Sequence, residues 1–204
     1  TKFWGMGRHA PDMSLTTPTL NDGERWAGKK VGLLGGSFNP AHKGHKHIAQ
    51  LALDHYGLDA IWWLVTPQNP LKDTLEMAAY DERFASVEKI IDGHPLMLAT
   101  HLERDLGTTF TYETVKGLKE HFPQTDFMFI CGMDNALIFH KWDRWRDLLD
   151  LIPFTFIDRP GAVEKVEGSP LKQVSHPNLR WLHGEEMVDI SSTQIRNSLK
   201  NNKI

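Results

Sequence analysis

The chain has 204 residues, of which 40% are hydrophobic, enough to bury the core of one compact domain and too few to require two. Its 23 lysines and arginines against 26 acidic residues leave a net charge of −3, which excludes the strongly basic surface typical of nucleic-acid-binding proteins. The single cysteine excludes a disulfide framework. Because we find neither a signal segment nor an apolar run near the ~20 residues of a membrane span, we expect no membrane partner and a cytoplasmic location.

Short apolar runs alternate with helical patterns along the chain. The predicted strands are residues 31–34, 60–65, 96–99, 127–131, 154–157 and 179–182, and the predicted helices are residues 45–55, 81–91 and 114–122. This alternation is typical of βαβ units, in which strands are parallel and crossovers right-handed. We therefore predict an α/β fold: a Rossmann-like, doubly wound, mostly parallel sheet with helices on both faces, in a single domain. Residues 1–28 are predicted to be an N-terminal extension, and residues 29–204 the domain.

The first predicted strand joins the first predicted helix through a turn of small and polar residues. The segment reads Gly35-Gly36-Ser37-Phe38-Asn39-Pro40-Ala41-His42-Lys43-Gly44-His45. Gly35 and Gly36 let backbone N–H groups approach an anion, and Ser37 adds a hydroxyl donor. The following helix start adds unpaired N–H groups and the positive end of a dipole. In a doubly wound sheet, this turn belongs where strand order reverses and ligands bind, so the pattern predicts a polyphosphate site.

Two histidines, His42 and His45, are three residues apart and can share one face of the helix start. Beside a phosphate, such a histidine could act as a cation or as a hydrogen-bond donor and stabilise charge on a transferring phosphoryl group. An ordinary turn is the alternative for the glycines, and a metal site is the alternative for the histidines. Because Cys131 is distant and no glutamate separates the histidines, we expect no metal held by the protein.

Two motifs carry a resemblance to a known family. The segment from Gly35 to His45 is similar to the T/HxGH signature of the nucleotidyltransferase superfamily, in the fuller form typical of bacterial nicotinate-nucleotide adenylyltransferases. Near the other end, Ile190-Ser191-Ser192-Thr193-Gln194-Ile195-Arg196 resembles the family motif I-S-S-T/S-x-I-R, whose hydroxyl and backbone groups hold the nucleotide and whose arginine meets the triphosphate. A capped terminal helix with a solvated Arg196 is the local alternative.

The resemblance implies sites for both substrates. The implied ATP-binding residues are Gly35, Gly36, Ser37, Phe38, His42, His45, Asp134, Ile190, Ser191, Ser192, Thr193 and Arg196. The implied nicotinate mononucleotide-binding residues are Gly36, Ser37, Thr111, Trp142 and Lys72, and the implied catalytic residues are His42, His45, Arg196 and Lys72.

Three of these assignments have local alternatives. Thr111 is equally suited to cap a helix, Asp134 to cap a helix over residues 135–139, and Lys72 to be a solvated loop residue. Asp143 follows Trp142 where an aromatic residue is common in the family, so the chain departs from the family pattern beside the predicted pyridine-binding residue.

The reaction that the resemblance implies is transfer of the adenylyl group of ATP to nicotinate mononucleotide, giving deamido-NAD and pyrophosphate in NAD biosynthesis. Mg²⁺ would be carried by ATP with mostly water ligands. The implied partners are therefore ATP and nicotinate mononucleotide, without nucleic acid, and the sequence leaves the oligomeric state open. The alternatives are an adenylyltransferase for nicotinamide mononucleotide or phosphopantetheine, and a nucleotide-binding relative that has lost catalysis.

Overall fold

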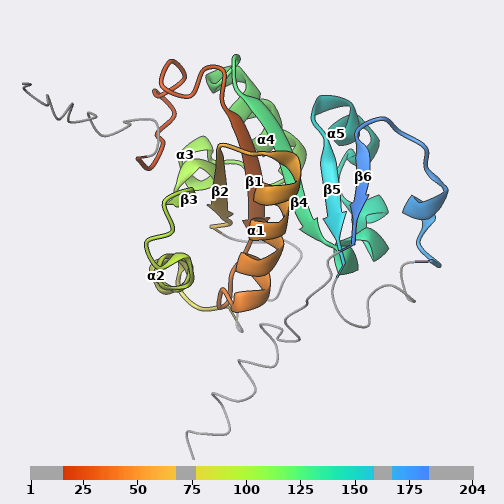
Figure 1. The fold of residues 1–204 in the computed structure, drawn as a ribbon, viewed down its shortest axis with the longest axis horizontal. Helices are drawn as coiled ribbons and strands as arrows, with labels where there is room; N and C mark the ends of the chain where they lie inside the picture. The colour runs from red at the N-terminus through yellow and green to blue at the C-terminus, as the bar shows by residue number, and fades with distance from the viewer. Residues whose placement is uncertain (1–15, 68–76, 159–166, 184–204) are drawn as a thin grey trace, which may run out of the picture.

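A six-stranded sheet forms the centre of the protein in a computed structural model, which describes residues 16–67, 77–158 and 167–183 (Figure 1). The strands are β1 (Lys30–Gly36), β2 (Ala60–Val65), β3 (Met97–Thr100), β4 (Asp126–Gly132), β5 (Phe154–Ile157) and β6 (Leu179–Leu182). Their order across the sheet is β3-β2-β1-β4-β5-β6, and every neighbouring pair is parallel. The predicted Rossmann-like, doubly wound sheet is confirmed.

The three predicted helices are present, and the described chain contains additional short ones. The α-helices are α1 (Lys43–Tyr56), α2 (Tyr80–Ile91), α3 (Leu102–Leu106), α4 (Thr111–His121) and α5 (Trp145–Leu151), and the 3₁₀ helices are η3 (Met133–Leu137), η4 (Phe139–Lys141) and η5 (Pro170–Gln173). The helices missed by the sequence analysis have three to seven residues. Segments this short do not complete the two turns on which a helical period can be recognised.

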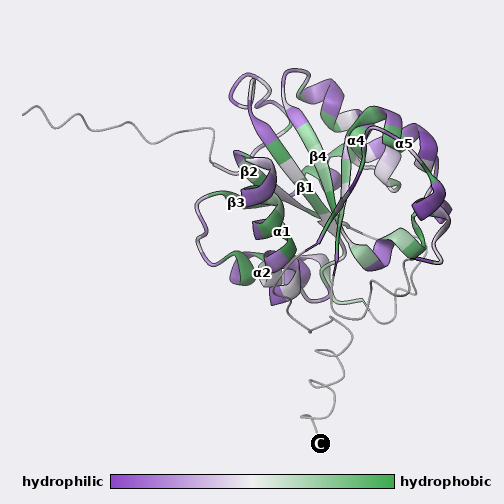
Figure 2. Ribbon diagram, turned by 45° about the vertical axis from the view of Figure 1, so that its right-hand side comes forward, coloured by the Kyte–Doolittle hydropathy of each residue, from purple (hydrophilic) through white to green (hydrophobic). Residues whose placement is uncertain are grey.

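The two faces of the sheet carry separate apolar cores because side chains alternate along each strand. In β2, Trp62 belongs to one core and Trp63 to the other. Helices α1 and α2 supply buried residues to the core of Trp63, whereas α3, α4 and α5 supply them to the core of Trp62. Figure 2 shows this pattern as hydrophobic strands between helices whose outer sides are hydrophilic. Helices on both faces are thus confirmed.

Residues before the predicted domain also contribute to a core. Trp26 is fully buried, and its ring meets the ring of Trp62 edge-on, with centroids 4.8 Å apart. The Thr125 hydroxyl donates a hydrogen bond to the Trp26 carbonyl oxygen at 2.8 Å. The boundary between residues 28 and 29 stays a prediction. None of the helices described is both long and apolar enough to cross a bilayer.

Candidate active site

The carboxyl ends of β1 and β4 lie side by side at the point where strand order reverses. Leu34 of β1 is paired with Ile130 of β4, while β2 and β5 lie on the outer sides of this pair. The turn that follows β1 and the 3₁₀ helix η3 that follows β4 therefore share one edge of the sheet. This is the ligand-binding position of doubly wound folds, where the sequence analysis places the polyphosphate site.

The turn after β1 is shorter than expected, because the strand continues through both glycines. Gly35 pairs with Leu64 and Gly36 with Val65, so the turn comprises residues 37–42. A Cβ on Gly35 would lie only 2.9 Å from Cζ of Phe129, closer than real side chains approach. The close packing of β1 against β4 is therefore one reason for glycine at position 35, which corrects its assignment to the turn itself.

His42 and His45 together form the cap of α1. The Gly44 N–H donates to Nδ1 of His42, and the His42 N–H donates to Nδ1 of His45, each at 3.1 Å. These two bonds satisfy N–H groups at the helix start that have no partner within the helix. The two rings stack with centroids 3.8 Å apart and planes 27° apart, so the histidines share one face as predicted.

The cap decides which nitrogen of each imidazole carries the proton. A nitrogen that accepts a hydrogen bond holds a lone pair there, so the neutral rings of His42 and His45 carry their protons on Nε2. Two positive rings stacked 3.8 Å apart would repel each other. Of the two possibilities that the sequence left open, cation or donor, this geometry favours a pair of neutral Nε2–H donors.

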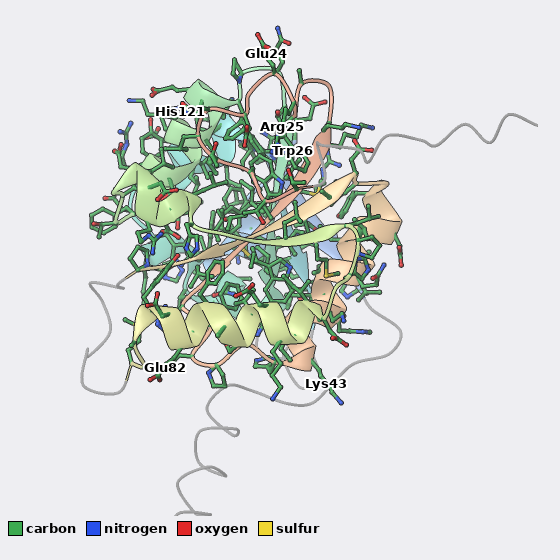
Figure 3. The ribbon with its side chains drawn as sticks, turned by 90° about the vertical axis from the view of Figure 1, so that its left-hand side faces the viewer. Glu24, Arg25, Trp26, Lys43, Glu82 and His121 are labelled. Atoms are coloured by element: carbon green, nitrogen blue, oxygen red, sulfur yellow. The ribbon has the colours of Figure 1, made fainter. Side chains whose placement is uncertain are left out.

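Two side chains of α2 and one backbone N–H before that helix hold the turn. Arg83 donates to the Ser37 carbonyl oxygen at 2.7 Å, and the Ala41 N–H donates to the Ser86 hydroxyl at 3.0 Å. The Ala78 N–H, just before the helix, donates to Oδ1 of Asn39 at 3.1 Å. Figure 3 shows α2 along this side of the molecule, with Glu82 and Lys43 far from Trp26. The turn is thus held from outside as well as by its own cap.

The sequence analysis missed Arg83, although a signal for it exists. Arg83, Val87 and Ile91 are spaced four residues apart on one helical face, and all three are buried. An arginine within an apolar stripe indicates a buried guanidinium with specific partners. Without Val87 and Ile91 on the same helical face, Arg83 could not be distinguished from a solvated surface charge.

Glu103 is a second buried ionisable group at this edge, also missed. The Thr66 hydroxyl, immediately after β2, donates to Oε2 of Glu103 at 3.1 Å, and the Thr66 N–H donates to the Gly36 carbonyl oxygen at 2.9 Å. Burial raises the pKa of Glu103 to about 7, against the opposing effect of hydrogen bonds from Thr66 and Thr114. Glu103 is therefore close to its midpoint of protonation at neutral pH.

Thr111, predicted to bind the mononucleotide, and Asp134, predicted to bind ATP, lie near helix starts, but neither residue caps its helix. Thr111 is the first residue of α4, whose cap position is occupied by Phe110 without a side-chain hydrogen bond. Asp134 lies inside η3, whose cap position is Gly132. The capping alternatives for Thr111 and Asp134 are therefore wrong. Trp142 follows η4, is half-buried, and has its ring centroid 5.0 Å from that of Phe139.

Several predicted site residues lie outside the described residues. These are Lys72, Ile190, Ser191, Ser192, Thr193 and Arg196. The residues that the structure does describe fall into two groups. Ser37, Phe38 and His42 lie in the turn after β1, His45 is the third residue of α1, and Asp134 lies in η3, which follows the adjacent β4. Thr111 is the first residue of α4, and Trp142 directly follows η4.

Comparison with known proteins gives concordant matches in sequence and in structure. Residues 33–198 match the family model described as cytidylyltransferase-like. The probable nicotinate-nucleotide adenylyltransferase of Parvibaculum lavamentivorans is 46% identical, with 83% of this chain and 92% of that protein covered. The protein of the same name from Agrobacterium fabrum is 36% identical, with 83% of this chain and 99% of that protein covered.

A solved structure shares the fold. The Plasmodium falciparum nicotinic acid mononucleotide adenylyltransferase complexed with NaAD matches with a TM-score of 0.69 at 22% sequence identity, covering 83% of each chain. A putative nicotinate-nucleotide adenylyltransferase from Vibrio parahaemolyticus matches with a TM-score of 0.58 at 22% identity, covering 86% of this chain and 90% of the other. At such identities the likeness establishes the architecture.

Proposed function

Because this chain belongs to the nicotinate-nucleotide adenylyltransferases, a family of cytidylyltransferase-like proteins, we propose that it transfers the adenylyl group of ATP to nicotinate mononucleotide. The products are deamido-NAD (nicotinate adenine dinucleotide) and pyrophosphate. One observation carries the proposal for this chain: two histidines cap the helix that follows β1, at the edge where strand order reverses. That arrangement supplies neutral donors and a helix start where a triphosphate would bind.

The chemistry requires no nucleophile from the protein. An oxygen of the mononucleotide 5′-phosphate attacks the α-phosphorus of ATP, the new P–O bond forms, and the bond from the α-phosphorus to the bridging oxygen breaks to release pyrophosphate. The attacking oxygen is already anionic, so catalysis depends on alignment and on stabilising charge. We assign this stabilisation to the Nε2–H groups of His42 and His45, together with Lys72 and Arg196, which the sequence motifs propose.

The remaining donors of the ATP site are assigned to the backbone around the turn. Gly35 and Gly36 would contact the nucleotide from the end of β1, and Ser37 and Phe38 from the turn after it. Asp134 would accept hydrogen bonds from ribose hydroxyls. Residues 190–193 complete this set on the basis of the second motif. Nucleotidyltransferases generally use a divalent metal with ATP, and we propose Mg²⁺ as that ion, bound to the triphosphate as part of the substrate.

The acceptor preference is assigned to Thr111 and Trp142. Thr111 opens α4, where its hydroxyl and unpaired N–H groups would suit the carboxylate of nicotinate. Nicotinamide lacks that negative charge and would leave these donors poorly paired, which is a strong basis for discrimination. Trp142 is half-buried and offers an aromatic ring for stacking on the pyridine ring.

The test is pyrophosphate release from ATP and Mg²⁺ with nicotinate mononucleotide, nicotinamide mononucleotide and phosphopantetheine at matched concentrations. We expect a strong preference for nicotinate mononucleotide. Faster release with another acceptor would keep adenylyl transfer and overturn the roles of Thr111 and Trp142. Binding of ATP without pyrophosphate release with any of the three acceptors would instead identify a relative without catalysis.

A further inference from the structure

Arg83 makes an unusual set of contacts for an arginine. Its side chain is buried, with 2% of its surface exposed. The guanidinium donates four hydrogen bonds, all to backbone carbonyl oxygens: from Nε to Ala78 at 2.9 Å, from Nη1 to Ser37 at 2.7 Å and Thr66 at 2.6 Å, and from Nη2 to Pro67 at 2.7 Å. Four of the five N–H donors of the group are thereby used.

These four carbonyl groups belong to three separate segments. Ser37 begins the turn after β1, Thr66 and Pro67 follow β2, and Ala78 precedes α2. Residues 68–76 follow Pro67 directly and end just before Met77, so one guanidinium holds carbonyl groups on both flanks of that stretch. The same segments are joined by the bond from the Thr66 N–H to the Gly36 carbonyl oxygen at 2.9 Å.

The contacts of Arg83 leave its positive charge without a carboxylate partner among the described residues. A buried guanidinium stays protonated, and here the carbonyl dipoles replace water around it. A buried salt bridge would neutralise this charge, whereas carbonyl groups leave it positive. The charged guanidinium is hydrogen-bonded to the carbonyl oxygen of Ser37, and Ser37 belongs to the turn where a polyphosphate is proposed to bind.

We propose that Arg83 is a positioning residue for adenylyl transfer. It fixes the turn that carries Ser37 and His42 relative to the end of β2 and to the segment just before α2. This inference rests on the proposed function. Arg83 has no role in the chemistry itself; it acts through the backbone that the substrates would contact. A planar fork that bonds three segments at once sets their relative positions, which a single flexible ammonium group cannot do.

The test compares Arg83→Lys with wild type and with Lys89→Met. Arg83→Lys keeps the charge but loses the planar fork, and Lys89→Met removes a cation from an exposed position of the same helix. Pyrophosphate release is measured well below each unfolding midpoint and normalised to the folded fraction. We expect kcat of Arg83→Lys to fall roughly 10- to 100-fold with a much smaller change in KM for ATP, because small displacements reduce turnover strongly. Lys89→Met should match wild type.

A second readout does not need activity. Hydrogen exchange followed by mass spectrometry should show faster exchange in Arg83→Lys for peptides covering residues 37–45, and no change for peptides covering residues 119–126, at the amino ends of the strands. Unchanged exchange in residues 37–45, or unchanged kcat in an active protein, would overturn the role of Arg83. Absence of pyrophosphate release from wild type would overturn the proposed function instead, and the exchange measurement would still decide whether Arg83 fixes the turn.

Discussion

At the amino edge of the sheet, the connections are held by backbone bonds and by side chains that are neutral or accessible to solvent, whereas at the carboxyl edge buried ionisable side chains hold them. At the amino edge, the Gly28 N–H donates to the Gln124 carbonyl oxygen, and the Asp126 N–H donates to that of Lys29. The Thr125 hydroxyl binds the Trp26 carbonyl in the same region. Figure 3 shows Trp26 and His121 at this end of the molecule.

The carboxyl edge contains every buried histidine, arginine, aspartate and glutamate of the described chain. These are His42 after β1, Arg83 at the ends of β1 and β2, Glu103 after β3 and Asp158 after β5. Burying such groups opposes folding unless they are paired, so their concentration on one edge indicates a function there. Stability and activity should therefore be separable: changes at the amino edge should affect mainly stability, whereas changes to the two histidines and the turn that carries them, at the carboxyl edge, should affect mainly turnover.

The largest expected effect is on stability, from Trp26→Ala at the amino edge. Trp26 is fully buried and packs edge-on against Trp62, so the substitution leaves a large cavity and should lower the free energy of unfolding by about 3–5 kcal/mol. Urea denaturation measures this change. Trp26→Phe is the matched control: it fills most of the space and removes an indole N–H that is buried without a partner among the described residues, so its loss of stability should be smaller. A fall in kcat of the folded protein would contradict the separation of the two edges.

His45→Asn should have the next largest effect, on turnover. The asparagine side chain can place an acceptor near the position of Nδ1 and so keep the bond from the His42 N–H, while it removes the Nε2–H donor. Loss of one such donor to a developing negative charge typically lowers kcat by about 10²–10³-fold, or roughly 3–4 kcal/mol.

Steady-state kinetics and ATP titration, taken together, measure this effect. The affinity for ATP and the unfolding midpoint of His45→Asn should change little. His45→Ala, which loses the cap as well, should also be less stable. If ATP affinity and turnover fell by equal factors, a role for His45 in the transition state would be ruled out.

Glu103→Gln should have a smaller effect, confined to the pH dependence of stability. The pKa of Glu103 is raised from 4.5 to about 7 in the folded protein, so folding favours the protonated form. The contribution of protonated Glu103 to the free energy of unfolding is fully present below pH 4.5. It is lost as the pH rises to about 7, and the loss is roughly 3 kcal/mol at most. Glutamine cannot ionise and should remove this part of the pH dependence.

Urea denaturation at pH 5 and pH 8 provides the comparison. Wild type should lose stability between the two values, and Glu103→Gln should lose less. Asp59→Asn is a control carboxylate at the amino edge, where Oδ2 accepts from the exposed Lys30 N–H, and it should leave the pH dependence nearly as in wild type. The same pH dependence in Glu103→Gln and wild type would show that Glu103 is not the group that titrates.

The fold was predictable from the sequence because the sheet is buried on both faces. Its inner strands therefore appear as mostly apolar runs, whereas β6, at the end of the sheet, is only partly buried and contains Arg180. Residues 60–65, 154–157 and 179–182 were predicted with the bounds that the structure has. The end of β1 was misplaced, since Gly35 and Gly36 resemble turn residues although their backbones continue the pairing with β2. Glycine indicates backbone freedom and close packing equally well, and the neighbour that decides between them, Phe129, is distant in sequence.

The site was predictable where its residues form a continuous motif and unpredictable where they do not. His42 and His45 were found because they lie in one continuous motif, but the hydrogen bonds to their Nδ1 atoms depend on the path of the backbone and could not be predicted from the sequence. Arg83 and Glu103 were missed because burial of a charged residue is set by distant segments. The roles of Lys72 and Arg196 stay predictions.

The pairing of β1 with β4 has a consequence for the order in which the protein acquires its shape during synthesis. β1, β2 and β3 are consecutive, but Lys30 pairs with Asp126, so the central pair of the sheet cannot form until the ribosome has released the chain beyond β4. A nascent chain that ends before residue 126 can contain the turn after β1 and helix α1, but it lacks β4 and η3, which form the other side of the proposed site. Domains generally fold as units, and contacts between distant segments form slowly. The ability to bind a nucleotide should therefore appear late, with the closing of the sheet.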